Sequence, residues 1–182
     1  MVHTSKRRLT VLQQEIVKLL FLKAGLVVNQ RAIAKFLDVS PPAVMKALPL
    51  LEEENILKIK QDKESKRWAI ELNTDNHRVI QLKRAENLKH IYESGLEEYL
   101  EKTYAGATIV VFGSYSRGDD IHNSDIDLAV IGRKKKEGDV RKYEQVLERK
   151  IHINFYESWS KIHTHLKENL CNGIVLSGGV EL

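Results

Sequence analysis

Two aspartates separated by a single residue are the part of the sequence best suited to catalytic chemistry. Asp125 and Asp127 open a mostly apolar run of Ile126, Leu128, Ala129 and Val130. Because alternate side chains of a β-strand point to the same face, the two carboxylates are expected to stand side by side. Carboxylate oxygens suit Mg²⁺ or Mn²⁺, and these ions take further ligands from water and from substrate phosphates. The spacing therefore predicts a site for a divalent cation.

A glycine and a serine lie upstream of these aspartates, directly after a second apolar run. Gly113 lets a phosphate approach the backbone closely, and Ser114 offers a hydroxyl and an amide where a short helix is expected to begin. Arg117 is expected either to contact a phosphate oxygen or to form a salt bridge with Asp119 or Asp120. Each motif alone fits an ordinary turn or a solvated, acid-capped strand, but the two together, each beside a strand pattern, favour a nucleotide site.

These motifs resemble the signature of the DNA polymerase β-like nucleotidyltransferase superfamily, and most of all its minimal nucleotidyltransferases. The clear part of the resemblance covers residues 107–131, through Gly113-Ser114, Arg117-Gly118 and Ser124-Asp125-Ile126-Asp127-Leu128. It implies a small mixed β-sheet flanked by helices, and so an α+β chain. It also implies transfer of a nucleoside monophosphate from a nucleoside triphosphate to an acceptor hydroxyl, with Asp125 and Asp127 holding Mg²⁺ or Mn²⁺.

The family usually adds a third carboxylate from a strand beside the two aspartates. Residues 150–156 alternate strictly and fit that strand, but they contain no carboxylate. His152 or Asn154 occupies the expected third position, while Glu157 falls on the opposite face. The resemblance therefore leaves three functions open: an active nucleotidyltransferase, a catalytically weak or inactive regulator of transcription that senses nucleotide, and an antitoxin-like partner of a small helical toxin.

The elements that precede this region predict a separate, basic domain. Residues 1–70 hold 13 Lys and Arg against 7 Asp and Glu, whereas residues 71–182 hold 16 against 18. Apolar periodicity and capping residues predict helices at 6–23, 29–37 and 40–54, and two alternating runs at 56–60 and 67–72 predict a hairpin. Three helices and a hairpin resemble a winged helix-turn-helix.

That resemblance implies DNA binding, with the helix at 40–54 in the major groove and the hairpin as the wing. The basic residues suited to this contact are Lys46 on the helix and Lys58, Lys60, Lys63, Lys66 and Arg67 on the hairpin. Three glutamates at 52–54 would repel phosphate at the end of the helix. The alternative is a winged helix used for dimerisation or for protein contacts.

A long helical stretch at 76–104, broken near Gly95, is expected to connect the two parts. Three segments follow: a winged helix-turn-helix domain at 1–74, a helical connector at 75–104 and a nucleotidyltransferase domain at 105–182. The connector is a candidate dimer seam, so a homodimer is expected. Its basic residues Lys83, Arg84 and Lys89 are expected on a solvated face. Further helices are predicted at 139–149 and 158–169, with a terminal strand at 174–176.

Composition excludes other classes of protein. No apolar run approaches the length of a membrane span, and the net charge is +4. Cys171 is the sole cysteine, which excludes an internal disulfide and a thiolate zinc site. A reducing cytoplasm is therefore the expected setting.

Overall fold

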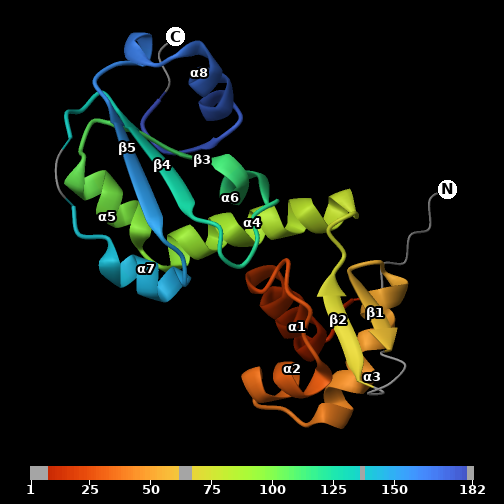
Figure 1. Cartoon of the computed structure of the whole chain (residues 1–182). Helices are drawn as coiled ribbons and strands as arrows, with labels where there is room; N and C mark the ends of the chain where they lie inside the picture. Colours follow the sequence, from red (N-terminus) through yellow and green to blue (C-terminus); the bar gives the residue numbers. More distant parts are fainter. Residues whose placement is uncertain (1–7, 62–66, 136–137, 180–182) are drawn as a thin grey trace. The chain divides into compact units, whose positions relative to one another are not determined.

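The chain folds into two compact units, Met1–Val79 and Ile80–Leu182. Figure 1 shows the computed structural model, which describes residues 8–61, 67–135 and 138–179. Each unit has a hydrophobic core of its own. Within the described ranges, no helix is both long enough and apolar enough to cross a membrane.

The three helices of the first unit begin at side-chain caps. They are α1 (Val11–Leu22), α2 (Gln30–Phe36) and α3 (Pro41–Glu53). Asn29 accepts a hydrogen bond from the backbone amide of Ala32 at 3.0 Å, and Ser40 accepts one from that of Ala43 at 3.3 Å, as predicted. The sequence predicts that the first helix starts earlier than it does. Thr10 and the side chain of residue 13 form a capping box, which fixes the start of α1 at Val11.

A two-stranded hairpin completes the first unit. Strands β1 (Leu57–Gln61) and β2 (Trp68–Leu72) pair antiparallel, with Leu57 opposite Leu72. The turn between them, with Lys63 and Lys66, lies outside the described residues. Phe36 at the end of α2 is 55% exposed, and the Lys23 ammonium lies 5.7 Å from its ring centroid. Three helices followed by this hairpin form a winged helix-turn-helix fold.

The second unit is built on a four-stranded mixed sheet in the order β5-β4-β3-β6. Strand β4 pairs antiparallel with β3 and parallel with β5, and β6 pairs antiparallel with β3. Its elements are α4 (His77–Glu93), α5 (Leu96–Thr103), β3 (Thr108–Phe112), α6 (Gly113–Arg117), β4 (Ile126–Ile131), α7 (Arg141–Leu147), β5 (Ile151–Tyr156), the 3₁₀ helix η1 (Trp159–Lys161), α8 (Thr164–Cys171) and β6 (Ile174–Ser177).

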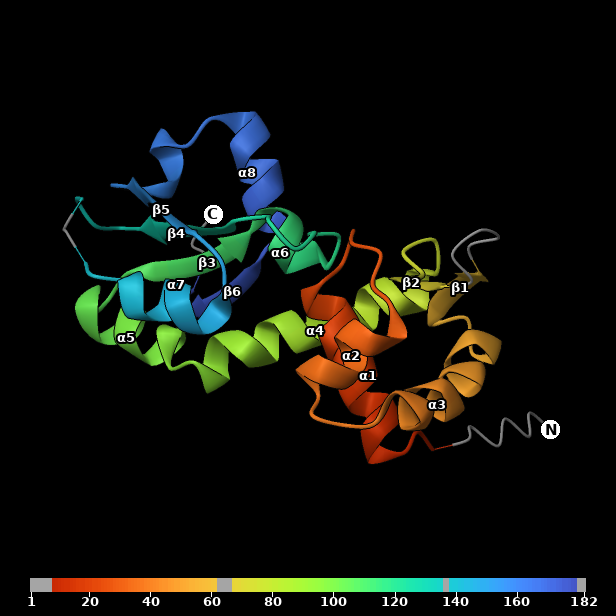
Figure 2. The same ribbon diagram turned by 60° about the horizontal axis from the view of Figure 1, so that its bottom comes forward.

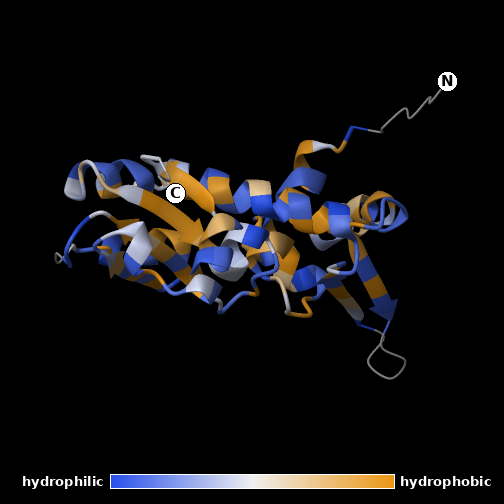
Figure 3. Cartoon of the chain, turned by 90° about the horizontal axis from the view of Figure 1, so that it is seen from above, coloured by the Kyte–Doolittle hydropathy of each residue, from blue (hydrophilic) through white to orange (hydrophobic). Residues whose placement is uncertain are grey.

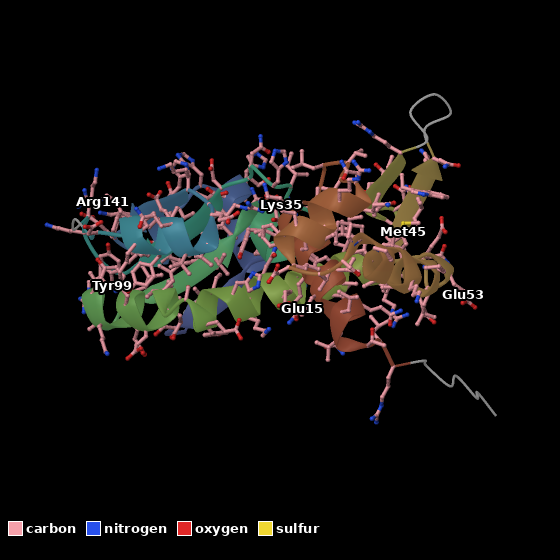
Figure 4. All side chains as sticks on the ribbon, turned by 90° about the horizontal axis from the view of Figure 1, so that it is seen from below. Glu15, Lys35, Met45, Glu53, Tyr99 and Arg141 are labelled. Carbon is pink, nitrogen blue, oxygen red and sulfur yellow. The ribbon has the colours of Figure 1, made fainter. Side chains whose placement is uncertain are left out.

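Helices cover both faces of this sheet, with α4, α5 and α7 on one side and α8 on the other (Figure 2). Alternate residues of the central strands supply the two cores, so Val111 and Leu128 face the first group of helices, whereas Val110 and Ala129 face α8. Apart from Thr108 in β3 and Asp127 in β4, the residues of both strands are apolar; Figure 3 colours the chain by hydropathy. The ring of Tyr99, labelled in Figure 4, lies 5.1 Å from that of Tyr143 on α7.

Two predicted helices of the second unit differ in the structure. The helix expected at 139–149 is the shorter α7, and the one expected at 158–169 is divided into η1 and α8. Ile162 separates these two pieces in an extended conformation and is 4% exposed, so the break places its side chain in the core beneath the sheet. Cys171 ends α8 and is exposed.

Candidate active site at the start of strand β4

The two aspartates lie at the end of the sheet where β4 begins. This end, with Asp125 and Asp127, is called the acidic edge below. Asp125 immediately precedes β4, and Asp127 is its second residue, so both belong to the face that α8 covers. The register places Asp127 opposite Phe112 on β3 and opposite His152 on β5. One sheet edge therefore gathers both aspartates and the predicted third-position residue His152. Asn154 pairs with Ala129 instead and lies further along β5.

The glycine–serine bend is in contact with this acidic edge. Gly113 begins α6 with φ +74°, a conformation that L side chains rarely adopt. A Cβ atom at this position would lie only 2.8 Å from Asp127 Oδ2. Glycine thus allows the bend to approach the carboxylate more closely than a residue with a side chain could, and Ser114 follows in the first turn of the short helix.

The electrostatics of the two aspartates differ. Burial raises the pKa of Asp127, and the nearby carboxylate of Asp125 raises it further, while His152 acts in the opposite direction. Asp125 is more exposed, and its Oδ2 lies 3.2 Å from His152 Nε2. In the part of the chain that the structure describes, no side chain forms an ion pair or a hydrogen bond with Asp127. A half-buried carboxylate without a cation beside it favours binding of a positively charged ligand.

The donor set fits a divalent cation that shares its ligands with a substrate. Two carboxylates on one face supply oxygen ligands, and the backbone of the glycine–serine bend lies directly beside Asp127. The described residues contain no group of three or more His, Cys, Asp or Glu side chains that could hold a metal ion by itself. Water and phosphate oxygens would have to complete the coordination.

Arg117 forms one of the two salt bridges considered from the sequence. Its Nε donates to Asp119 Oδ2 at 3.1 Å, and both side chains are about half exposed. Asp120, the other candidate partner, is instead buried at 3% exposure. The guanidinium is therefore held beside Asp119, on an exposed part of the loop that follows α6.

The predicted DNA contacts differ in their exposure. Lys46 on α3, Lys60 on β1 and Arg67 before β2 are exposed. Lys58 Nζ donates to Asp75 Oδ2 at 2.6 Å, so its charge is already partly neutralised. The wing residues between β1 and β2 fall in the undescribed turn.

The sequence prediction for Lys83 is wrong. Instead of lying on a solvated face of α4, Lys83 is 0% exposed and pairs with Asp120. The helical spacing indicates that Lys83 is buried. It lies four residues from Val79 and from Asn87, on a line that continues to Ile91, and all four side chains are buried. The charge of the side chain obscured that pattern.

A cavity of about 980 Å³ lies at the opposite end of the same sheet. It is lined by the start of β3 at Thr108, the end of β4 at Ile131 and the end of β6 at Ser177, together with Trp159. The acidic edge lies where β3 ends and β4 begins, so this cavity is not part of the candidate active site. The chemistry of the side chains, rather than the size of the cavity, identifies the site.

Comparison with known proteins supports the assignment of the second unit. Residues 93–176 match the sequence model of the nucleotidyltransferase domain family. No curated protein matches the sequence significantly. The site residues on β3, α6, β4 and β5 all fall within the matched segment.

Several solved structures are similar to the chain at low identity. A mutant of Lactococcus lactis ZitR is 23% identical, with a TM-score of 0.40, over 54% of this chain and 64% of that one. A crystal structure of ZitR described as a zinc-responsive MarR family member gives 23% and 0.40, over 57% and 68% of the two chains. S. aureus MepR, solved in a complex with DNA, gives 21% and 0.39, over 52% and 77%.

The fold and the family match describe two different units joined in one chain. The first unit carries three capped helices and a hairpin, and the second carries the mixed sheet with its acidic edge. Residues 93–176 match the nucleotidyltransferase domain family, and the first unit has a winged helix-turn-helix fold.

Proposed function

We propose that the chain is a metal-dependent nucleotidyltransferase that transfers a nucleoside monophosphate from a nucleoside triphosphate to an acceptor hydroxyl. One observation carries this proposal: Asp127 shares a face with Asp125 and lies against Gly113, where a Cβ atom would come within 2.8 Å of Oδ2. A pair of carboxylates beside a glycine–serine bend is suited to a cation that shares its coordination with substrate phosphates.

Some residues of the site would bind the cation, and others would bind the phosphates. Asp125 and Asp127 would hold Mg²⁺ or Mn²⁺, which when bound supplies positive charge against the phosphate oxygens. Ser114 and the amides after Gly113 would hold the terminal phosphates at the start of α6. The acceptor oxygen bonds to the α-phosphorus, the bond to pyrophosphate breaks, and the hydroxyl proton passes to solvent.

Transfer of a radioactive α-phosphate tests this function directly. The full chain is incubated with each of the four labelled triphosphates, Mg²⁺, and protein, nucleic-acid and small-molecule fractions of a cell extract. An acceptor should become labelled, and Asp127→Asn should reduce labelling by about a hundredfold or more, because a carboxylate–metal contact supplies several kcal/mol of charge stabilisation. Asp119→Asn is the matched control and should remain active. Equal labelling by wild type and Asp127→Asn would disprove the proposal.

A nucleotide-sensing regulator is the second candidate, and the register of β5 favours it. The position opposite Asp127 holds His152 rather than a carboxylate, which weakens metal binding and activation of the acceptor. This function predicts binding of a triphosphate in the presence of Mg²⁺ without turnover, and a shift in DNA affinity when it binds. Calorimetry that shows no nucleotide binding would exclude this candidate.

We also propose that the first unit binds DNA through α3 and the hairpin. The support is the winged helix-turn-helix fold and the exposed cations Lys46, Lys60 and Arg67. Because each phosphate contact releases counterions, Lys60→Ala should lower the slope of log affinity against log salt by about 1. Lys18→Ala, which removes a half-buried lysine paired with Glu15 on α1, is the control. An unchanged slope for Lys60→Ala and Arg67→Ala would remove the hairpin from the interface.

The homodimer and the toxin-like partner stay predictions from the sequence. Sedimentation of the full chain measures the first. Co-purification with the product of an adjacent gene that encodes a small helical protein measures the second.

A further inference from the structure

A buried polar cluster lies in the second unit outside the acidic edge. Lys83 and Asn87 of α4 meet Asp120 from the loop after α6, and Arg149 approaches it from the segment before β5. These four side chains are 0%, 6%, 3% and 7% exposed. Burial of a charge is strongly unfavourable unless partners compensate for it, so this cluster carries a large desolvation penalty.

Every member of the cluster contacts Asp120 or comes close to it. Lys83 Nζ pairs with Asp120 Oδ1, and Asn87 Nδ2 donates to the same oxygen at 2.7 Å. The guanidinium of Arg149 lies 3.9 Å from Asp120 Oδ2 and also donates to the carbonyl of His122. The carboxylate of Asp120 is thus hydrogen-bonded to α4 through Oδ1, while Arg149 lies at ion-pair distance from Oδ2.

The segment that carries Asp120 joins the two halves of the candidate active site. It follows the phosphate-side helix α6 and precedes Asp125. At its start, Gly118 packs so closely on α4 that a Cβ atom would lie 2.5 Å from the carbonyl oxygen of Ile80. Within α6, Asn87 Nδ2 also donates to the carbonyl oxygen of Tyr115 at 2.9 Å. The cluster therefore holds both α6 and the loop that leads from it to the aspartates.

Stability alone does not explain why this cluster is polar. Well-packed apolar side chains of similar volume often stabilise a fold as well as a buried ion pair does, or better. Hydrogen bonds and ion pairs are directional, whereas apolar contacts are not. The donors of Lys83, Asn87 and Arg149 can therefore each hold an oxygen atom at a defined position. A site that must hold a phosphate and a cation together needs such fixed geometry between its halves.

We propose that Lys83, Asn87 and Arg149 are positioning residues that set the distance between the glycine–serine bend and the aspartate pair through Asp120. This inference rests on the proposed nucleotide site. It predicts that the cluster governs affinity for a metal–triphosphate complex, although none of its side chains belongs to the acidic edge. The loop at 117–124 is the part whose mobility should increase when the cluster is lost.

A paired replacement separates positioning from stability. In the full chain, Lys83→Met combined with Asp120→Leu removes the buried ion pair, and Arg149 keeps its hydrogen bond to the carbonyl of His122. We expect a melting temperature close to that of wild type, at least a tenfold weaker Kd for Mn²⁺–ATP or the triphosphate that wild type prefers, and at least tenfold faster amide exchange at 117–124. Exchange in β3 and β4 should not change. Lys89→Met, an exposed lysine of the same helix, is the control.

Asn87→Leu is the second variant if the paired replacement does not fold. It removes the donors to Asp120 and Tyr115 and leaves the ion pair, so the same loss of affinity and the same local exchange are expected. Wild-type affinity and wild-type exchange in a folded variant of either kind would overturn the proposal. If wild type binds no triphosphate, the proposed function fails, while the exchange at 117–124 still decides whether the cluster orders the loop.

Discussion

Asp120 and Asp127, two carboxylates of the same unit, meet opposite surroundings. Asp120 is buried and receives Lys83 and Asn87, with Arg149 close by. Asp127 is half-buried beside a second carboxylate, and within the described residues no cation pairs with it. The fold therefore compensates for one buried acid and leaves the other to a ligand. This contrast separates a residue that organises the loop from one that binds.

Removal of the compensated carboxylate, Asp120, should reduce stability more than any other substitution considered. Asp120→Ala leaves the ammonium of Lys83 buried without its carboxylate, so the free energy of unfolding should fall by about 3–5 kcal/mol. Urea titration of the full chain measures this change. Asp119→Ala, which removes an exposed pair, should cost less than about 1 kcal/mol. Equal effects of the two substitutions would show that Asp120 is not held as described.

Two glycines with the same φ angle test the close contact between Gly113 and the uncompensated carboxylate of Asp127. Gly113 and Gly95 both have φ +74°, but of the two only Gly113 lies where an added Cβ atom would meet a neighbour, namely Asp127 Oδ2. Alanine should cost about 1–2 kcal/mol at each position because of the left-handed conformation. Only Gly113→Ala should also weaken triphosphate binding, by about tenfold, since its methyl group displaces the carboxylate. Calorimetry and thermal unfolding of both variants measure the two effects.

Addition of a carboxylate opposite Asp127 tests what the edge lacks. His152→Asp places a third acid at the register position beside Asp127, and it should raise metal affinity or transfer rate by about tenfold. Asn154→Asp adds the same charge on the same strand opposite Ala129, and it serves as the matched control. If Asn154→Asp gives the same gain, total charge rather than position is responsible.

The pH dependence of stability should give the smallest effect. The pKa of Asp127 is raised in the folded chain, so folding favours its protonated form, and this contribution is lost as pH rises through the folded pKa, above the ordinary value of 3.8. Compared with wild type, Asp127→Asn should therefore gain stability over that pH range. Thermal unfolding at stepped pH measures the difference, and a difference independent of pH would contradict the assigned environment. Mg²⁺ with triphosphate should stabilise wild type and remove the advantage.

Local patterns in the sequence predicted most elements of both units. The caps at Asn29 and Ser40, the break at Gly95 and the strand pattern of β5 are confirmed. Each depends on a short-range rule: a side chain that accepts from nearby amides, a residue that tolerates positive φ, or an alternation of apolar positions. The pairing of Asp125 with Asp127 could be predicted for the same reason, since residues i and i+2 of a strand share a face.

Features that depend on residues far apart in the chain could not be predicted from the sequence. Lys83 has the periodicity of a core residue, but its charge indicates solvent unless Asp120, far along the chain, is known to lie opposite. The division of the last helix also depends on packing, because Ile162 leaves helical geometry to reach the core under the sheet. In both cases tertiary contacts override the local preference.

Cys171 gives the molecule a built-in reporter. It is the single cysteine of the sequence and it is exposed, so a maleimide dye will attach at one position without any mutation. Gly173, just beyond it, packs against the carbonyl oxygen of Val111, which brings this end of α8 to the same end of β3 that carries Gly113. An environment-sensitive fluorophore on Cys171 would accordingly change its emission as triphosphate enters, and titrations could be followed in real time.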